Sequence, residues 1–131
     1  IDHTQVDARL GNWEDVRALS GTVELVADLI VNHVSSSSPQ FFDFSKKGLA
    51  SEYAGMFLTF DRVFPQGARE SDLLAIYRPR PSLPFSPVTL ASGERTLLWT
   101  TFNPEQVDID VRHPQAEAYL DSILGSFRLR V

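Results

Sequence analysis

One long aliphatic run constrains the fold of this chain more than any other feature. Residues 23–31 (VELVADLIV) are aliphatic apart from Glu24 and Asp28, and several are β-branched. Such a run predicts a strand that is covered on both faces, as in a parallel sheet. One strand of this kind leaves backbone groups unpaired on both sides, and too few others are predicted to close a sheet around it. The pattern therefore predicts an α/β fragment.

Two helices are predicted, one on each side of a long middle stretch. Asn12 is a suitable N-cap with Asp15 in a capping-box position, and residues 20–21 end that first helix. Pro114 suits the first position of a second helix over residues 114–127. Apolar side chains recur there at spacings of three and four: Ala116, Leu120, Ile123, Leu124 and Phe127. Residues 128–131 (RLRV) are expected to begin another strand.

The middle of the chain, residues 34–113, has a different character. It holds seven of the eight prolines and most of the aromatic residues, with weak periodicity. So long an irregular stretch is usually functional, or a subdomain inserted in a loop. Residues 56–60 and 96–100 are the expected short strands, and the four serines of residues 35–38 are expected to form a flexible turn.

Composition excludes several classes of function. Twelve Lys and Arg against seventeen Asp and Glu give a net charge of −5, which argues against a broad basic surface for nucleic acid or anionic lipid. The apolar runs are too short to span a membrane. Cysteine is absent, so disulfides and thiolate metal sites are excluded. The three histidines lack metal-ligand spacing. We expect no nucleic acid, membrane, metal or cofactor, and a cytoplasmic location.

Polar residues interrupt and end the aliphatic run. Asp28 lies within it, where an ionised carboxylate is expected to need a partner. Asn32 and His33 follow its end, and in β/α barrels the carboxyl ends of the strands face the active site. Being adjacent, the two side chains are expected to point to opposite faces. His33 alone fits an ordinary loop histidine better, whereas the pattern Asp-x-x-x-Asn-His is more specific.

The second candidate cluster is the loop of residues 77–81 (YRPRP). Its prolines fix the backbone, and each guanidinium presents a rigid fork of donors that suits phosphate oxygens. An anion site and a surface loop paired with nearby carboxylates explain it equally well. Four aromatic residues are candidates to stack on a sugar ring, although a small core is the better explanation for most of them: Tyr77, Phe85, Trp99 and Phe102.

Several short motifs together resemble one known family. Residues 28–33 (DLIVNH) look like the first conserved region of the alpha-amylase superfamily. More narrowly, the chain resembles the sucrose phosphorylases, through motifs that run in order and cover almost all of residues 1–124. These motifs are residues 1–7 (IDHTQVD), 9–13 (RLGNW), 56–59 (MFLT), 76–81 (IYRPRP), 98–102 (LWTTF) and 106–110 (QVDID).

The resemblance implies an architecture for the N-terminal part, the long middle stretch and the C-terminal part of the chain. It implies an α/β fold, a partial (β/α)8 TIM barrel with an inserted domain B. Residues 1–33 and 114–131 would belong to the barrel and supply its second helix, third strand and third helix. Residues 34–113 would be domain B, which this family inserts after the third strand.

The resemblance also implies a reaction and a set of binding residues. Sucrose and inorganic phosphate would give α-D-glucose 1-phosphate and D-fructose with retention of configuration, through a glucosyl-enzyme intermediate and without a cofactor. The implied roles are His33 in the donor subsite, Asn32 and Asp28 supporting its loop, Phe102 against the donor ring, Gln106 on the acceptor side, and Tyr77, Pro79 and Arg80 in the acceptor loop, with Arg80 contacting phosphate. Whether the full-length parent enzyme is a homodimer is left open.

The chain departs from the family in its chemistry. The family's nucleophilic aspartate has no counterpart here, because residues 128–131 (RLRV) carry arginine where an Arg-x-Asp pattern is expected. The family's acid/base glutamate has no counterpart in this sequence either. We therefore expect no catalytic residue in this chain, an inactive fragment, and poor stability or association through open edges. Two alternatives remain: a sister phosphorylase of sucrose 6'-phosphate, glucosylglycerol or glucosylglycerate, and a stand-alone sugar-binding module without catalysis.

Overall fold

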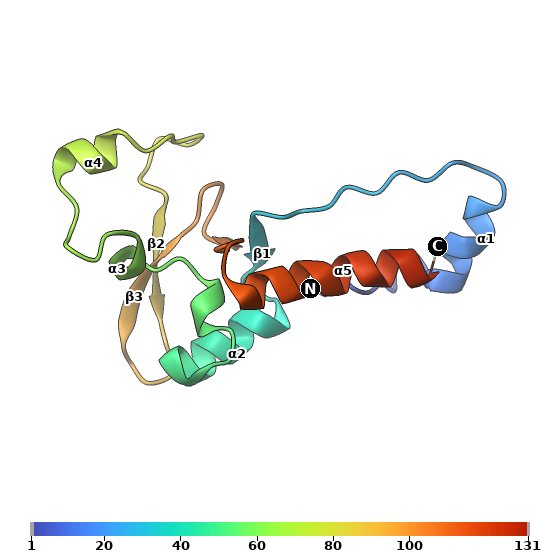
Figure 1. The fold of residues 1–131 in the computed structure, drawn as a ribbon, viewed down its shortest axis with the longest axis horizontal. Coiled ribbons are helices and arrows are strands. Elements are labelled where there is room, and N and C mark those ends of the chain that lie inside the picture. Colours follow the sequence, from blue (N-terminus) through green and yellow to red (C-terminus); the bar gives the residue numbers. More distant parts are fainter. Residues whose placement is uncertain (1, 131) are drawn as a thin grey trace.

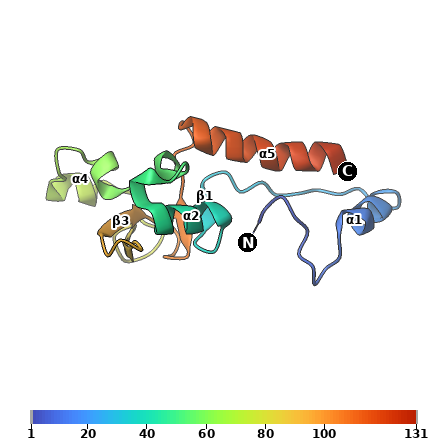
Figure 2. The same cartoon turned by 90° about the horizontal axis from the view of Figure 1, so that it is seen from below.

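A compact lobe at one end and a long helix reaching away from it make up the fold (Figures 1 and 2). The structure, a computed structural model, describes residues 2–130. In both views α5 and the segment before β1 extend from the lobe toward α1. The elements in chain order are α1 (Trp13–Ser20), β1 (His33–Ser35), α2 (Pro39–Lys47), the 3-10 turns η1 (Gly48–Ala50) and η2 (Ala54–Met56), α3 (Phe60–Val63), α4 (Glu70–Leu74), β2 (Phe85–Thr89), β3 (Arg95–Trp99), β4 (Gln106–Asp108) and α5 (Pro114–Arg130).

The first predicted helix is confirmed as α1. The side chain of Asn12 accepts the N–H of Asp15 at 3.3 Å, and the carboxylate of Asp15 accepts the N–H of Asn12 at 2.8 Å, which completes the capping box. The indole of Trp13 meets the ring of Phe127 edge-on, with 5.4 Å between ring centroids. This aromatic contact places α1 at the far end of α5.

The aliphatic run does not form the strand predicted over residues 23–31. In this structure residues 24–31 have no strand or helix assignment and form an arm between α1 and β1 (Figure 1). Val26 is 94% exposed, and Asp28 is exposed too. The physical reason is that a strand needs hydrogen-bonded neighbours, and no strand among residues 2–130 pairs with this segment. Strand structure begins only at His33.

Within residues 2–130, four short strands form two separate antiparallel pairs. β2 pairs with β3, and β1 pairs with β4. The strand predicted over residues 96–100 is confirmed by β3. The strand predicted over residues 56–60 was wrong, because η2 ends at residue 56 and α3 begins at residue 60. Only two isolated bridges remain, Phe57 with Ile109 and Thr59 with Leu98.

The middle stretch and α5 share one core, and α2 is one of several elements of the middle stretch that the sequence pattern did not predict. The predicted turn is confined to residues 36–37, since Ser35 ends β1 and the buried Ser38 caps α2 by accepting the N–H of Phe41 at 3.2 Å. Pro39 occupies the first turn of α2. The core residues are Val34, Phe41, Phe44, Met56, Phe57, Leu90, Leu98, Val107, Ile109, Ala116, Tyr119 and Ile123.

The second predicted helix is confirmed as α5, which starts at Pro114 as expected. Ala116 and Ile123 of its predicted apolar face are buried, whereas Leu124 is 41% exposed. The strand expected from residue 128 onward was wrong, because α5 continues to Arg130 with no Gly or Pro there to end it. Val131 lies outside the described residues. No helix within residues 2–130 is both long and apolar enough to cross a membrane.

Candidate functional site

The antiparallel pair of β1 and β4 presents one apolar and one polar face. Val34 lies opposite Val107 in the register, and these two side chains are 0% and 1% exposed in the core. Neighbouring residues of a strand point to opposite faces, while directly paired residues share a face. The other two pairs therefore project from the opposite face: His33 with Asp108, and Ser35 with Gln106.

Four of the predicted site residues meet at His33. The ring atom Nε2 lies 2.9 Å from Nε2 of Gln106, and the ring atom Nδ1 lies 3.2 Å from Oδ1 of Asn32. An amide nitrogen donates and an amide oxygen accepts, so together they select the neutral tautomer with the proton on Nδ1. The ring of Phe102 packs edge-on, 5.6 Å away and tilted by 61°. Asn32 thus turns toward His33, although opposite directions were expected.

A cavity of about 330 Å³ opens beside this cluster. Its wall is formed by His3, Ile30, His33, Ser35, Asn103, Glu105 and Gln106. The hydroxyl of Tyr119 lies 2.9 Å from Nδ1 of His3, and burial raises the pKa of Tyr119 to about 12. The two groups share this hydrogen bond, and the pKa of His3 is lowered, chiefly by burial.

His3 is the residue of this wall that sequence reasoning missed. It lies 30 positions from His33 in the chain, and no spacing between the histidines pointed to a shared site. The available signal was its place in the motif of residues 1–7. Its hydrogen bond to Tyr119 of α5 carries the N-terminal segment to the cavity.

The acceptor-loop candidates differ in where their side chains lie: Arg80 bonds the protein, whereas the others are exposed. The guanidinium of Arg80 donates from Nη2 to the carbonyl of Thr100 at 2.7 Å and to its Oγ1 at 2.9 Å. Its Nε is buried and has no hydrogen-bond partner. Tyr77, in contrast, is 82% exposed, and Pro79 is exposed as well. The structure thus places Arg80 against the segment after β3 and leaves Tyr77 and Pro79 at the surface.

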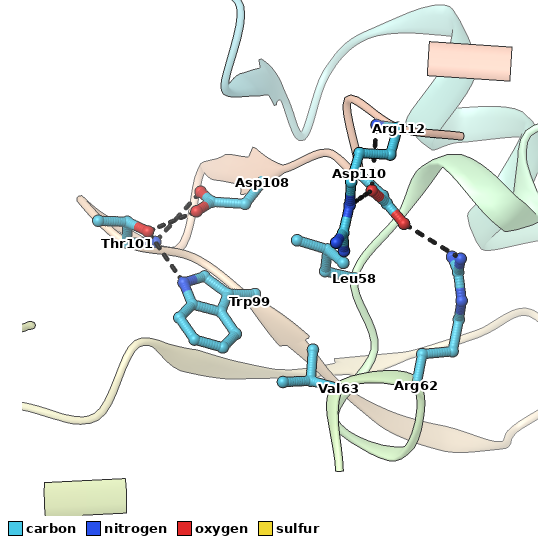
Figure 3. A pocket seen from close by; sticks show the side chains of 8 residues that line it. All are labelled: Leu58, Arg62, Val63, Trp99, Thr101, Asp108, Asp110 and Arg112. Atoms are coloured by element: carbon cyan, nitrogen blue, oxygen red, sulfur yellow. Dashed lines mark hydrogen bonds and ion pairs between the residues drawn. The ribbon is translucent and has the colours of Figure 1, made fainter. Parts of the chain in front are cut away.

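Asp108 connects the two groups of candidates. Its carboxylate accepts the N–H of Thr101 at 3.2 Å and the hydroxyl of the same residue, and that hydroxyl accepts the indole N–H of Trp99 at 2.9 Å (Figure 3). Burial raises the pKa of Asp108, while the bonds from Thr101 and the charge of Arg80 act in the opposite direction. His33 lies opposite Asp108 in the strand register, and Arg80 bonds Thr100, the neighbour of Thr101, so both candidates are linked to this buried carboxylate.

A second cavity, of about 540 Å³, is lined in part by Asp108 (Figure 3). There Asp110 accepts ion pairs from Arg62 at 3.6 Å and from Arg112 at 3.4 Å. Arg62 also donates to the backbone carbonyls of Gly55 and Phe57, at 2.5 and 2.8 Å. Arg62 therefore holds two backbone segments together, whereas the guanidinium of Arg112 bonds the carboxylate of Asp110.

The remaining candidates do not join the site. Asp28 is exposed and, within residues 2–130, makes no hydrogen bond or ion pair. The expectation that it is buried and paired was wrong here, because the arm that carries it has no cover. Phe85 and Trp99 pack on each other at 5.0 Å, as small-core residues do. Residues 2–130 contain no group of three or more side chains that would hold a metal ion.

Comparison with known proteins places this geometry in context. No protein-family model matches the chain. Over 126 residues it is 56% identical to the sucrose phosphorylase of Agrobacterium vitis, and over 123 residues 54% identical to that of Bifidobacterium adolescentis. These matches take in 96% and 94% of this chain but only 26% and 24% of the relatives.

A solved structure agrees in fold as well as in sequence. The sucrose 6F-phosphate phosphorylase from Thermoanaerobacter thermosaccharolyticum superposes with a TM-score of 0.90 at 33% identity, covering 97% of this chain and 27% of that one. The mixed α/β arrangement described above is thus that of part of a phosphorylase. Over nearly its whole length, this chain is homologous to one segment of the sucrose phosphorylases, and that segment makes up about a quarter of their length.

Proposed function

We propose that this chain is a segment of a retaining phosphorylase that transfers the glucosyl group of sucrose to inorganic phosphate, giving α-D-glucose 1-phosphate and D-fructose. Residues 1–33 and 114–131 belong to its (β/α)8 barrel, and residues 34–113 form domain B. The uncovered arm of residues 24–31 supports this division, since a barrel strand would find its neighbours in the rest of such an enzyme.

The observation that carries the proposal is the convergence of His33, Asn32, Gln106 and Phe102. They combine a ring nitrogen, two amides and a half-exposed aromatic face beside a polar cavity. Such a mixture suits a sugar, whose hydroxyl groups need polar partners and whose ring faces are apolar. His33 and Phe102 bind the glucosyl ring, Gln106 lines the acceptor side, and Asn32 supports the loop. Asp28, exposed here, supports the loop once the rest of the barrel covers the arm.

Arg80 is the proposed phosphate contact, in a loop that it shares with Tyr77 and Pro79. Its Nη2 is held by Thr100, while its Nη1 bonds no residue within 2–130, which leaves the donors of Nη1 for an anion. The chain carries no proposed nucleophile or acid/base, so the segment alone is inactive. Sucrose, inorganic phosphate and glucose 1-phosphate are the partners of the parent enzyme, which we propose to be a homodimer.

A chimera tests the proposal directly. Residues 2–124 replace the matching segment of the Agrobacterium vitis sucrose phosphorylase, of which this chain covers 26%. We expect the chimera to form glucose 1-phosphate from sucrose and phosphate, and the same chimera with His33→Ala to lose most of that activity. A folded chimera that forms no glucose 1-phosphate would refute the proposal.

The second candidate is a phosphorylase of sucrose 6'-phosphate, favoured by the close structural match to an enzyme named for that substrate. The higher identity to the sucrose phosphorylases argues for sucrose. Grafting residues 2–124 into both hosts and comparing fructose with fructose 6-phosphate as acceptors separates the two. If the graft shifts both hosts toward fructose 6-phosphate, the second candidate replaces the first.

A further inference from the structure

Three consecutive residues after β3 each hold a different member of the candidate site. Thr100 accepts a hydrogen bond from the guanidinium of Arg80. Thr101 donates one to the carboxylate of Asp108, and Phe102 packs against His33. The corner of residues 100–102 therefore sets the position of both halves of the proposed site. What fixes this corner determines how accurately the site is built.

We infer that Asp108 is a positioning residue of the donor-sugar subsite, acting through Thr101 to hold Phe102 against His33. This inference rests on the proposed function. The indole of Trp99 only donates and an ionised carboxylate only accepts, so the hydroxyl between them has a single direction. Two bonds from Thr101, one from its backbone and one from its side chain, then fix its orientation on Asp108.

Phe102 depends on this anchor because little else restrains it. Its side chain is 46% exposed, and its ring contact is the edge-on one with His33. The carboxylate, in contrast, belongs to a residue that is only 8% exposed and lies directly opposite His33 in the strand register. A buried group on the pair of strands thus places an exposed ring on the loop beside it.

Thr100 has a separate effect, which makes the inference testable. It is fully buried, and its hydroxyl also bonds Oγ of Ser86 at 2.6 Å, so it fixes Arg80 to β2. In a double displacement the glucosyl ring is present in both half-reactions, whereas phosphate enters only the second. Loss of the Thr101 anchor should impair both half-reactions, and loss of the Thr100 anchor only the one with phosphate.

The experiment compares Thr101→Val, Thr101→Ser and Thr100→Val in the chimera. We expect Thr101→Val to lower kcat/KM for sucrose and the rate of hydrolysis by about tenfold each, or about 1.4 kcal/mol, and Thr101→Ser to restore both. Thr100→Val should lower kcat/KM for phosphate and leave hydrolysis within twofold. Asp108→Asn should follow Thr101→Val, whereas Asp110→Asn, the control that removes a neighbouring carboxylate, should not.

A second readout separates this inference from the proposed function. The ring protons of His33, observed by NMR after selective histidine labelling, should lose the ring-current shift from Phe102 in Thr101→Val and Asp108→Asn but keep it in Asp110→Asn. An inactive chimera with these shifts refutes the proposed function and supports the positioning role. Unchanged His33 shifts in Thr101→Val and Asp108→Asn would overturn the positioning role. Equal effects of Thr101→Val, Asp108→Asn and the control Asp110→Asn would overturn it too.

Discussion

Gly55→Ala is expected to disturb the contact between η2 and α5. A Cβ at residue 55 would lie 2.2 Å from Nε2 and 2.3 Å from Cε1 of His113. The imidazole is not free to swing away, because its Nδ1 accepts the N–H of Gln115 at 3.3 Å in the first turn of α5. The methyl group must therefore either break that bond or push η2 and α5 apart.

The magnitude follows from these two options. Breaking the Gln115 bond costs about 1 kcal/mol, and overpacking costs about 1–3 kcal/mol, so we expect Gly55→Ala to destabilise the chimera by about 1–2 kcal/mol. The contact matters to the site because the carbonyl of Met56, the next residue, accepts the N–H of Asp110 at 2.9 Å. A shift of η2 thus reaches the segment that continues from β4.

A double-mutant cycle with His113→Ala gives a sign that can refute the reasoning. Without the imidazole the new methyl group meets no obstacle, and Gly→Ala then stabilises by about 0.4–1 kcal/mol by restricting the unfolded chain. The melting temperatures of the four chimeras are the measurement. If Gly55→Ala destabilises as much with alanine at residue 113 as with histidine, the steric argument is wrong.

Three further predictions follow from charge, titration and exposure. Arg80→Ala in the chimera should lower phosphorolysis at least tenfold more than hydrolysis, because phosphate loses charge-assisted bonds that water does not use; equal losses would contradict the phosphate role. The raised pKa of Tyr119 means that the folded state favours its protonated form, a stabilisation present below pH 10 and lost as the pH rises toward 12; urea unfolding of the chimera should lose this alkaline decline in Tyr119→Phe. The 131-residue chain alone should show no cooperative melting as a monomer, since Leu10, Val26 and Leu49 are more than 80% exposed; a sharp monomeric transition would disprove this.

Local signals in the sequence were enough for the elements that depend on local interactions. The capping box of Asn12 and Asp15 and the proline at residue 114 predicted the starts of α1 and α5, because caps act within one turn. The strand over residues 23–31 was not obtained, since strand pairing depends on neighbours elsewhere in the chain. Helix α2 was missed because the serine run looked like a turn, although its last member, Ser38, is a cap.

The site divides in the same way. Asn32, His33, Gln106 and Phe102 were singled out before the fold was known, by motif and by resemblance, and the structure brings them together. Asp108 was not among the predicted site residues. Its contacts with Thr101 and its register with His33 come from the pairing of β1 with β4, which joins positions more than 70 residues apart in the chain. No local pattern contains such a pairing.

The burial of the aromatic residues distinguishes core from candidate site, which composition did not. Phe57 is fully buried and packs on Phe44 at 5.0 Å, so its apolar area is used by the core. Tyr77 and Phe102 keep 82% and 46% of their surfaces exposed, and each is close in the chain to a polar group of the candidate site. An exposed ring costs hydrophobic free energy that a bound sugar face would recover. Exposure next to the polar groups of the candidate site therefore sets these two rings apart, since the exposed ring of Phe42 lies under Lys46 instead.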